Sequence, residues 1–175
     1  MKALRITFVI IVLILITVFI LGAIFPSEHH IEQRIAIGAK PSKVFNQINT
    51  LKNWNNWSPS SPEFSYSGPA SGVGARQTWI NDKGKGYLEI TRSEPNHFVQ
   101  AVMKFPGEKR FITNWMLRPD KDSTYVIWGM EFGELSYPLG RLEGIITNGR
   151  MQANIHRGLN NLKAYIEEDR KESIK

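Results

Sequence analysis

A long apolar run near the N-terminus constrains this chain more than any other feature. Residues 6–25 are 20 consecutive uncharged residues, and they follow the short segment Met1-Lys2-Ala3-Leu4-Arg5. A helix rises about 1.5 Å per residue, so this run would be about 30 Å long, which matches the hydrocarbon core of a bilayer. We therefore predict one transmembrane helix over residues 6–25, through which the protein contacts the membrane.

Two alternatives to a retained anchor are a cleaved signal peptide and a buried core helix. A signal peptide has an apolar region of about 7–15 residues and ends in small residues, whereas Gly22 and Ala23 are followed here by Ile-Phe-Pro. A core helix of a soluble domain carries a polar stripe, and only Thr7 and Thr17 interrupt this run. A retained single-pass anchor is the interpretation that we favour.

Charges on the two sides of the run predict its orientation. Lys2 and Arg5 precede it, and Glu28 and Glu32 follow it. Because positive charge is enriched on the cytoplasmic side of membrane helices, we expect a cytoplasmic N-terminus. The rest of the chain is then a periplasmic or extracellular domain of a cell-membrane protein.

The part after the span is long enough for one domain. We divide the chain into a cytoplasmic tip with an anchor, residues 1–26, and a folded domain, residues 27–175. Subtracting the charges of Lys2 and Arg5 from the net charge of +6 leaves +4 after the span, on scattered basic residues. This pattern argues against nucleic-acid binding, which needs clustered phosphate contacts. The absence of cysteine excludes disulfides, thiolate nucleophiles and cysteine-based metal sites.

Hydrophobic periodicity predicts an α+β domain. A strand over residues 31–37 precedes a helix that begins at Pro41 and a second short helix that contains Leu51, Trp54 and Trp57. Turn residues then separate six predicted strands, over residues 64–67, 75–80, 87–93, 98–105, 109–117 and 124–132. Such closely spaced strands favour an antiparallel meander.

The last predicted element is a long helix from about residue 139 to residue 169. Ile155, Leu159, Leu162 and Ile166 follow helical spacing and form an apolar stripe, and Gly149 suggests a break or kink before it. A curved sheet wrapped around this helix buries both apolar surfaces.

Three passages together resemble the START/Bet v 1-like (SRPBCC) superfamily, and in particular its polyketide cyclase/dehydrase and lipid-transport group. The first is residues 39–45 with the Trp54–Pro59 passage, WNNWSP. The second is residues 72–75 with Trp79 and residues 86–91; the third is residues 124–130 with Met151 and residues 158–163. The resemblance covers residues 30–168 and implies the helix-grip fold. That superfamily includes lipid carriers, cyclases, hydrolases and sensors, so the fold alone does not decide the function.

The resemblance also implies an apolar cavity between the sheet and the long helix. Strand alternation gives the candidate lining residues Trp79, Met103, Phe105, Trp115, Val126, Trp128 and Met130. The same side chains could instead fill the space as a solid core. The sequence leaves both interpretations open.

Signals for catalysis and for metal binding are weak. Glu28, His29, His30 and Glu32 lie close in sequence, but adjacent histidines beside a span are also typical of interfacial polar residues. Alternation places Glu131 on the outer face of its strand. No hydrolase, metalloprotease or phosphate-loop motif is present. We therefore predict no catalytic residue, no metal site and no cofactor.

Three function classes follow from these observations. The favoured one is a membrane-anchored, non-catalytic module that binds an apolar small molecule or a lipid. The alternatives are a protein-interaction or sensing domain with a filled cavity, and an enzyme of the polyketide cyclase or hydratase type. An enzyme requires titratable groups inside the cavity, whereas a binding module requires volume and an apolar wall.

Overall fold

The computed structural model describes residues 2–58, 63–107, 110–133 and 135–172. In chain order its elements are the helix α1 (Lys2–Ile24), the strand β1 (His29–Ile37), the helix α2 (Pro41–Asn49), the 3-10 helix η1 (Leu51–Asn56), the strands β2 (Ser65–Ser67), β3 (Arg76–Asn81), β4 (Gly84–Glu94), β5 (Phe98–Lys104), β6 (Arg110–Asp120) and β7 (Ser123–Phe132), and the helix α3 (Leu139–Glu172). Pro59, the last residue of the Trp54–Pro59 passage, lies outside the described residues, and so does residue 109, the first residue of a predicted strand.

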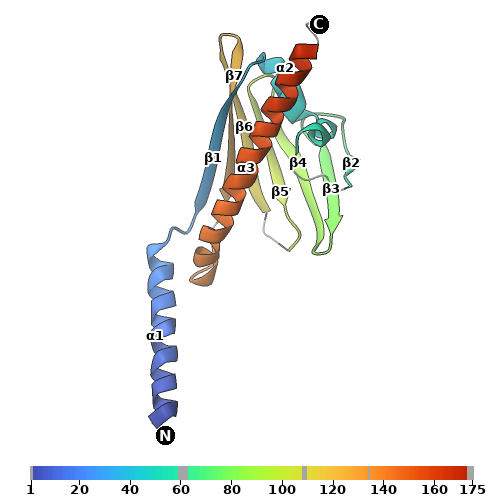
Figure 1. The fold of residues 1–175 in the computed structure, drawn as a ribbon. Coiled ribbons are helices and arrows are strands. Elements are labelled where there is room, and N and C mark those ends of the chain that lie inside the picture. The colour runs from blue at the N-terminus through green and yellow to red at the C-terminus, as the bar shows by residue number, and fades with distance from the viewer. Residues whose placement is uncertain (1, 59–62, 108–109, 134, 173–175) are drawn as a thin grey trace.

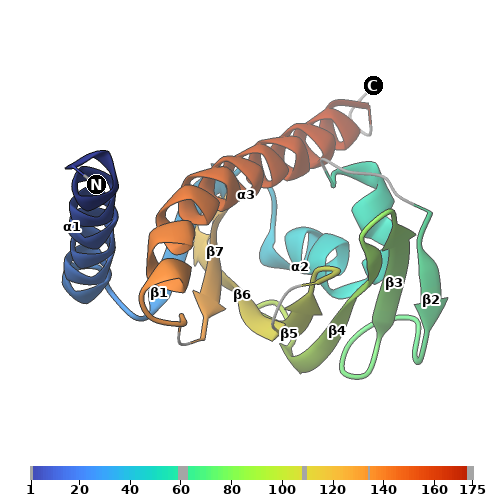
Figure 2. The same ribbon diagram turned by 90° about the horizontal axis from the view of Figure 1, so that it is seen from below.

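All seven strands form one antiparallel sheet in the order β1-β7-β6-β5-β4-β3-β2. The strands from β2 to β7 are a meander, and β1 closes the edge by pairing with β7. Seen from below, the strands follow an arc, with α2 inside it and α3 running across its open side (Figure 2). This arrangement confirms the predicted α+β helix-grip fold.

Helix α3 covers the concave face of the sheet (Figure 1). Its buried apolar side chains recur at helical spacing and are Met151, Ile155, Leu159, Leu162 and Ile166. The helix is continuous from Leu139 to Glu172, so the break that Gly149 suggests does not occur. A single glycine lowers helix propensity by about 1 kcal/mol, which the packing of one continuous apolar stripe outweighs.

Two tryptophans fix the helical insertion after β1. Pro41 begins α2 at its first turn, where the missing N–H costs no hydrogen bond. In and just after η1, the indole of Trp54 donates to the Ile48 carbonyl at 2.9 Å, and that of Trp57 donates to the Gln47 carbonyl at 3.3 Å. Both rings are thereby held over the concave face of the sheet.

Helix α1 stands away from the sheet, and only its C-terminal end approaches α3 (Figure 1). It is long and apolar enough to cross a membrane, and only 6% of its apolar stretch is buried. A helix with so little buried surface is not a core helix of this domain.

Candidate functional site

A cavity of about 170 Å³ lies between the concave face of the sheet and the middle of α3. The residues around it are mostly aromatic or sulfur-containing: Trp54, Ser58, Phe64, Gln77, Trp79, Met103, Phe105, Trp128, Met130, Met151, Asn154 and Ile155.

Strand alternation explains why these side chains meet. Met103 lies on β5, and Phe105 follows two residues later, just after that strand ends. Trp128 and Met130 are likewise two residues apart on β7, so the members of each pair point to the same face of the sheet. On α3, the lining residues Met151, Asn154 and Ile155 lie at spacings of three and four, on one helical face. Sheet and helix therefore contribute opposite walls.

Five of the seven residues that the sequence predicts as cavity lining lie around this cavity: Trp79, Met103, Phe105, Trp128 and Met130. The other two, Trp115 and Val126, are fully buried but do not line it. The Trp115 ring packs 5.2 Å from the Trp54 ring and 5.2 Å from the Trp128 ring, between centroids. The core is therefore solid around Trp115 and hollow on the other side of Trp128.

Gln77 is the polar group that the sequence analysis missed. Its side chain lines the cavity and is only 2% exposed. Among the described residues, its amide oxygen Oε1 has no hydrogen-bond partner. The signal was present in the sequence, because Gln77 precedes the inward-facing Trp79 by two residues and so faces the same side.

Trp128 differs from Gln77 because its indole N–H has a hydrogen-bond partner. Its indole N–H donates to the Thr113 hydroxyl at 2.9 Å, and that hydroxyl donates to the Gly129 carbonyl at 3.2 Å. This buried chain of hydrogen bonds fixes the ring that separates the cavity from the solid core.

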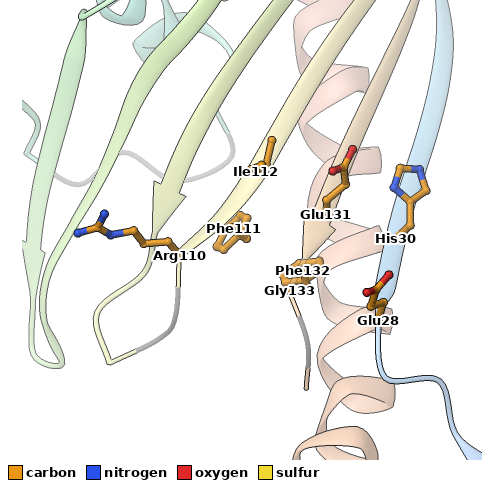
Figure 3. Close-up of a pocket in the computed structure, with 8 residues that line it drawn as sticks. All are labelled: Glu28, His30, Arg110, Phe111, Ile112, Glu131, Phe132 and Gly133. Atoms are coloured by element: carbon orange, nitrogen blue, oxygen red, sulfur yellow. The ribbon is translucent and has the colours of Figure 1, made fainter. Parts of the chain in front are cut away.

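A second, wider hollow of about 640 Å³ lies at the end of the sheet where β1 begins and β7 ends (Figure 3). Its polar side chains come from Glu28, His30, Arg110 and Glu131, and its apolar ones include Phe111, Ile112 and Phe132. Glu131 lies exposed, as alternation predicts, and accepts a hydrogen bond from Asn114 Nδ2 at 3.0 Å. Within the part of the chain that the structure describes, no three His, Asp or Glu side chains come together as metal ligands.

Comparison with known proteins agrees with this geometry. The model of the family described as polyketide cyclase/dehydrase and lipid transport matches residues 28–167. A search of curated proteins found no match.

Several solved structures share the fold at low sequence identity. The protein TTHA0849 from Thermus thermophilus is 15% identical, with a TM-score of 0.65 over 81% of this chain and 99% of that chain. The Aha1 dimer from Colwellia psychrerythraea is 18% identical, with a TM-score of 0.59 over 79% of this chain and 96% of that chain. A point mutant of Thalictrum flavum norcoclaurine synthase, in complex with a transition-state analogue, is 13% identical, with a TM-score of 0.64 over 82% of this chain and 96% of that chain. At these identities, the comparisons show a shared fold.

Proposed function

This chain belongs to the polyketide cyclase/dehydrase and lipid-transport family, and on that basis we propose that it is a membrane-anchored, non-catalytic module that binds an apolar small molecule or a lipid. The ligand occupies the cavity between the sheet and α3. The observation that carries the proposal is an apolar cavity lined by the Gln77 side chain, whose buried amide oxygen has no hydrogen-bond partner among the described residues.

The Gln77 amide supports a ligand with one polar group. A buried polar atom that lacks a hydrogen bond costs about 1–3 kcal/mol, and a ligand that supplies the bond recovers this free energy. A hydroxyl group both donates and accepts, so it can pair with either end of the amide. We therefore expect an apolar ligand with a hydroxyl or a comparable group.

The volume and the flexibility of the walls support a ligand segment of modest size. An apolar cavity of about 150 Å³ accepts benzene, so a cavity of about 170 Å³ accepts a ring or a short acyl segment. Three of the five methionines in the chain, Met103, Met130 and Met151, lie in the wall. Methionine side chains adapt easily, so a larger ligand can widen the space.

The composition of the wall supports a non-catalytic role. General acid–base catalysis needs a titratable group within hydrogen-bond reach of the substrate. None of the described residues around the cavity is an acid, a histidine, a lysine or an arginine; the polar ones are Ser58, Gln77 and Asn154. We propose binding without chemical conversion.

The membrane part of the proposal rests on α1. Its length and its exposed apolar surface suit a retained anchor over residues 6–25, with residues 27–175 as the folded domain beyond the membrane. An anchored module of this kind meets apolar ligands where they concentrate, at the bilayer.

The pair naphthalene and 2-naphthol tests the role of Gln77. The full chain in lipid nanodiscs is titrated with each compound, tryptophan fluorescence is recorded, and partitioning into empty nanodiscs is subtracted. We expect 2-naphthol to bind about tenfold more tightly than naphthalene, which corresponds to about one buried hydrogen bond. Replacing Gln77→Leu should remove this preference.

Gln47→Leu is the matched control, because Gln47 Oε1 is also buried and without a partner among the described residues but does not line the cavity. It should leave the preference for 2-naphthol unchanged. Absence of saturable binding of either compound to the native chain would contradict the proposed function.

A further inference from the structure

The end of α1 is built into the folded domain at the beginning of α3. Tyr137 donates a hydrogen bond from its hydroxyl to the Phe19 carbonyl at 2.8 Å, and the two rings make an edge contact at 5.7 Å between centroids. Gly22 lies so close to Pro138 that a Cβ added to the glycine would be 2.5 Å from the Pro138 Cβ. This contact requires glycine on the α1 side.

Arg141 ties the two helices together electrostatically. Its Nη1 lies 3.1 Å from the Gly22 carbonyl and 3.4 Å from the Phe25 carbonyl. Carbonyls in the last turn of a helix lack partners within the helix, and the C-terminal end carries a partial negative charge. A guanidinium group there satisfies both requirements, so α1 ends in a cap that α3 provides.

The position of the Tyr137 contact along α1 indicates how deep the Tyr137 hydroxyl lies in the membrane. Phe19 precedes Phe25, the last residue of the apolar run, by six residues, or about 9 Å along a helix. If residues 6–25 span the hydrocarbon layer, the Tyr137 hydroxyl lies below the edge of that layer. In such an apolar environment a hydroxyl needs a hydrogen-bond partner, and the Phe19 carbonyl supplies one to Tyr137.

The surface around this junction is apolar and exposed. Ile24 is 70% exposed, and Leu139 is 67% exposed. In water both would be unfavourable, whereas at the edge of a bilayer they are buried in acyl chains at about 25 cal/mol per Å² of apolar surface.

We infer that the segment Tyr137–Arg141 is a second membrane-contacting element, docked on α1, and that its partner is the lipid surface of the bilayer in which α1 is anchored. This inference rests on the anchoring in the proposed function and adds a fixed orientation to it. On this inference, α1 is retained as part of the folded structure.

The orientation has a consequence for the cavity. A continuous row of ring contacts crosses the sheet from Trp79 through Phe105 and Phe111 to Phe132, with centroid distances of 5.9, 5.6 and 5.0 Å. Phe132 ends β7 and pairs with His29 at the start of β1, close to the end of α1. The aromatic row therefore connects the cavity with the end of the sheet at which β1 begins and β7 ends. This is the end that the contact between α1 and the segment Tyr137–Arg141 places next to the membrane.

Single cysteines test the inference, because the chain has none of its own. Leu139→Cys and, as a reference, Asp122→Cys are labelled with an environment-sensitive fluorophore in the full chain. Asp122 is exposed in the turn before β7. At 3.3 Å per residue, β7 places this turn about 30 Å from Phe132, which lies at the end of the strand that leads into α3. The chain is reconstituted in vesicles of phosphatidylcholine and phosphatidylglycerol that contain nitroxide-labelled lipid. We expect several-fold stronger quenching at position 139 than at position 122.

A wedge in the junction provides the second arm. Gly22→Leu forces α1 and α3 apart, and Ala23→Leu places the same side chain at the neighbouring, exposed position. Both substitutions keep the span apolar. Gly22→Leu should reduce the quenching at position 139 to the level at position 122, and Ala23→Leu should preserve it.

The outcomes separate this inference from the proposed function. A native chain that is shortened at its N-terminus, or that alkaline carbonate extracts from membranes, would refute the anchoring itself. A retained chain with equal quenching at positions 139 and 122 would overturn the docked membrane contact alone. Equal quenching at position 139 in the Gly22→Leu and Ala23→Leu variants would overturn the role of the junction.

Discussion

Gly86 offers a sharp test of the cavity wall. It pairs with Trp79 across β3 and β4, and the indole covers it: a Cβ added to Gly86 would be 2.4 Å from Trp79 Cε2. Ordinary contacts of a Cβ begin at 3.4 Å, so Gly86→Ala must displace the ring by about 1 Å. Trp79 is buried and lines the cavity, so this movement disturbs the wall.

Gly129→Ala is the matched control, because Gly129 also lies inside a strand and an added Cβ would have its nearest neighbour at 3.5 Å, an ordinary contact. Both substitutions reduce the conformational entropy of the unfolded chain equally, which stabilises by about 0.4–1 kcal/mol. The difference between the variants is therefore the overpacking cost at Trp79, about 1–3 kcal/mol.

Thermal denaturation of the full chain in detergent, followed by tryptophan fluorescence, measures this difference. For a domain of this size, 1 kcal/mol shifts the melting temperature by about 2–4 °C, so Gly86→Ala should melt about 2–12 °C below Gly129→Ala. In nanodiscs, Gly86→Ala should also weaken binding of 2-naphthol, while Gly129→Ala binds it as the native chain does. Equal melting temperatures, or a less stable Gly129→Ala variant, would refute the reasoning.

Three further predictions concern the tryptophan cluster, the domain boundary and the topology. Trp128→Phe should lower the free energy of unfolding by about 1 kcal/mol more than Trp115→Phe. Both substitutions remove the same ring volume, but Trp128 also loses its indole hydrogen bond to Thr113, whereas the Trp115 indole has no partner among the described residues; equal denaturation midpoints would contradict this. A fragment of residues 27–175 should be soluble without detergent and unfold cooperatively in urea, because α1 meets the domain only at its end; aggregation would show that α1 belongs to the core. A reporter that is active only after export should be active when fused to Lys175, because Lys2 and Arg5 precede the span. Activity of a cytoplasmic reporter at the same position would show that the predicted orientation is wrong.

The local periodicities of this protein follow from its sequence alone. An apolar run with no charge can be read without structure, because length and composition decide whether a helix can cross a bilayer. Alternation with a period of two showed which face of each strand is apolar, and spacing of three and four showed the buried stripe of α3. The order of these elements predicted a curved antiparallel sheet wrapped around the long C-terminal helix, and the resemblance to a known superfamily implied the helix-grip fold.

Which inward side chains surround empty space depends on the three-dimensional packing. Alternation assigns Trp115, Val126 and Trp128 to the same face, but it carries no information on how far each lies from α3. Sheet curvature and strand register set that distance, and they place Trp115 in a solid tryptophan cluster and Trp128 at the cavity. The same register brings the Gln77 amide to the cavity, where its oxygen has no partner among the described residues.

The junction between α1 and α3 depends on tertiary structure for the same reason. Gly22 and Arg141 are separated by 119 positions in the chain, and no local pattern relates a glycine at the end of an apolar helix to an arginine in the first turn of a distant one. Their contact exists because β1 pairs with β7, the strand that leads into α3, which brings the end of α1 beside the beginning of α3. Periodicity determines which residues face inward, whereas long-range pairing determines which of them meet.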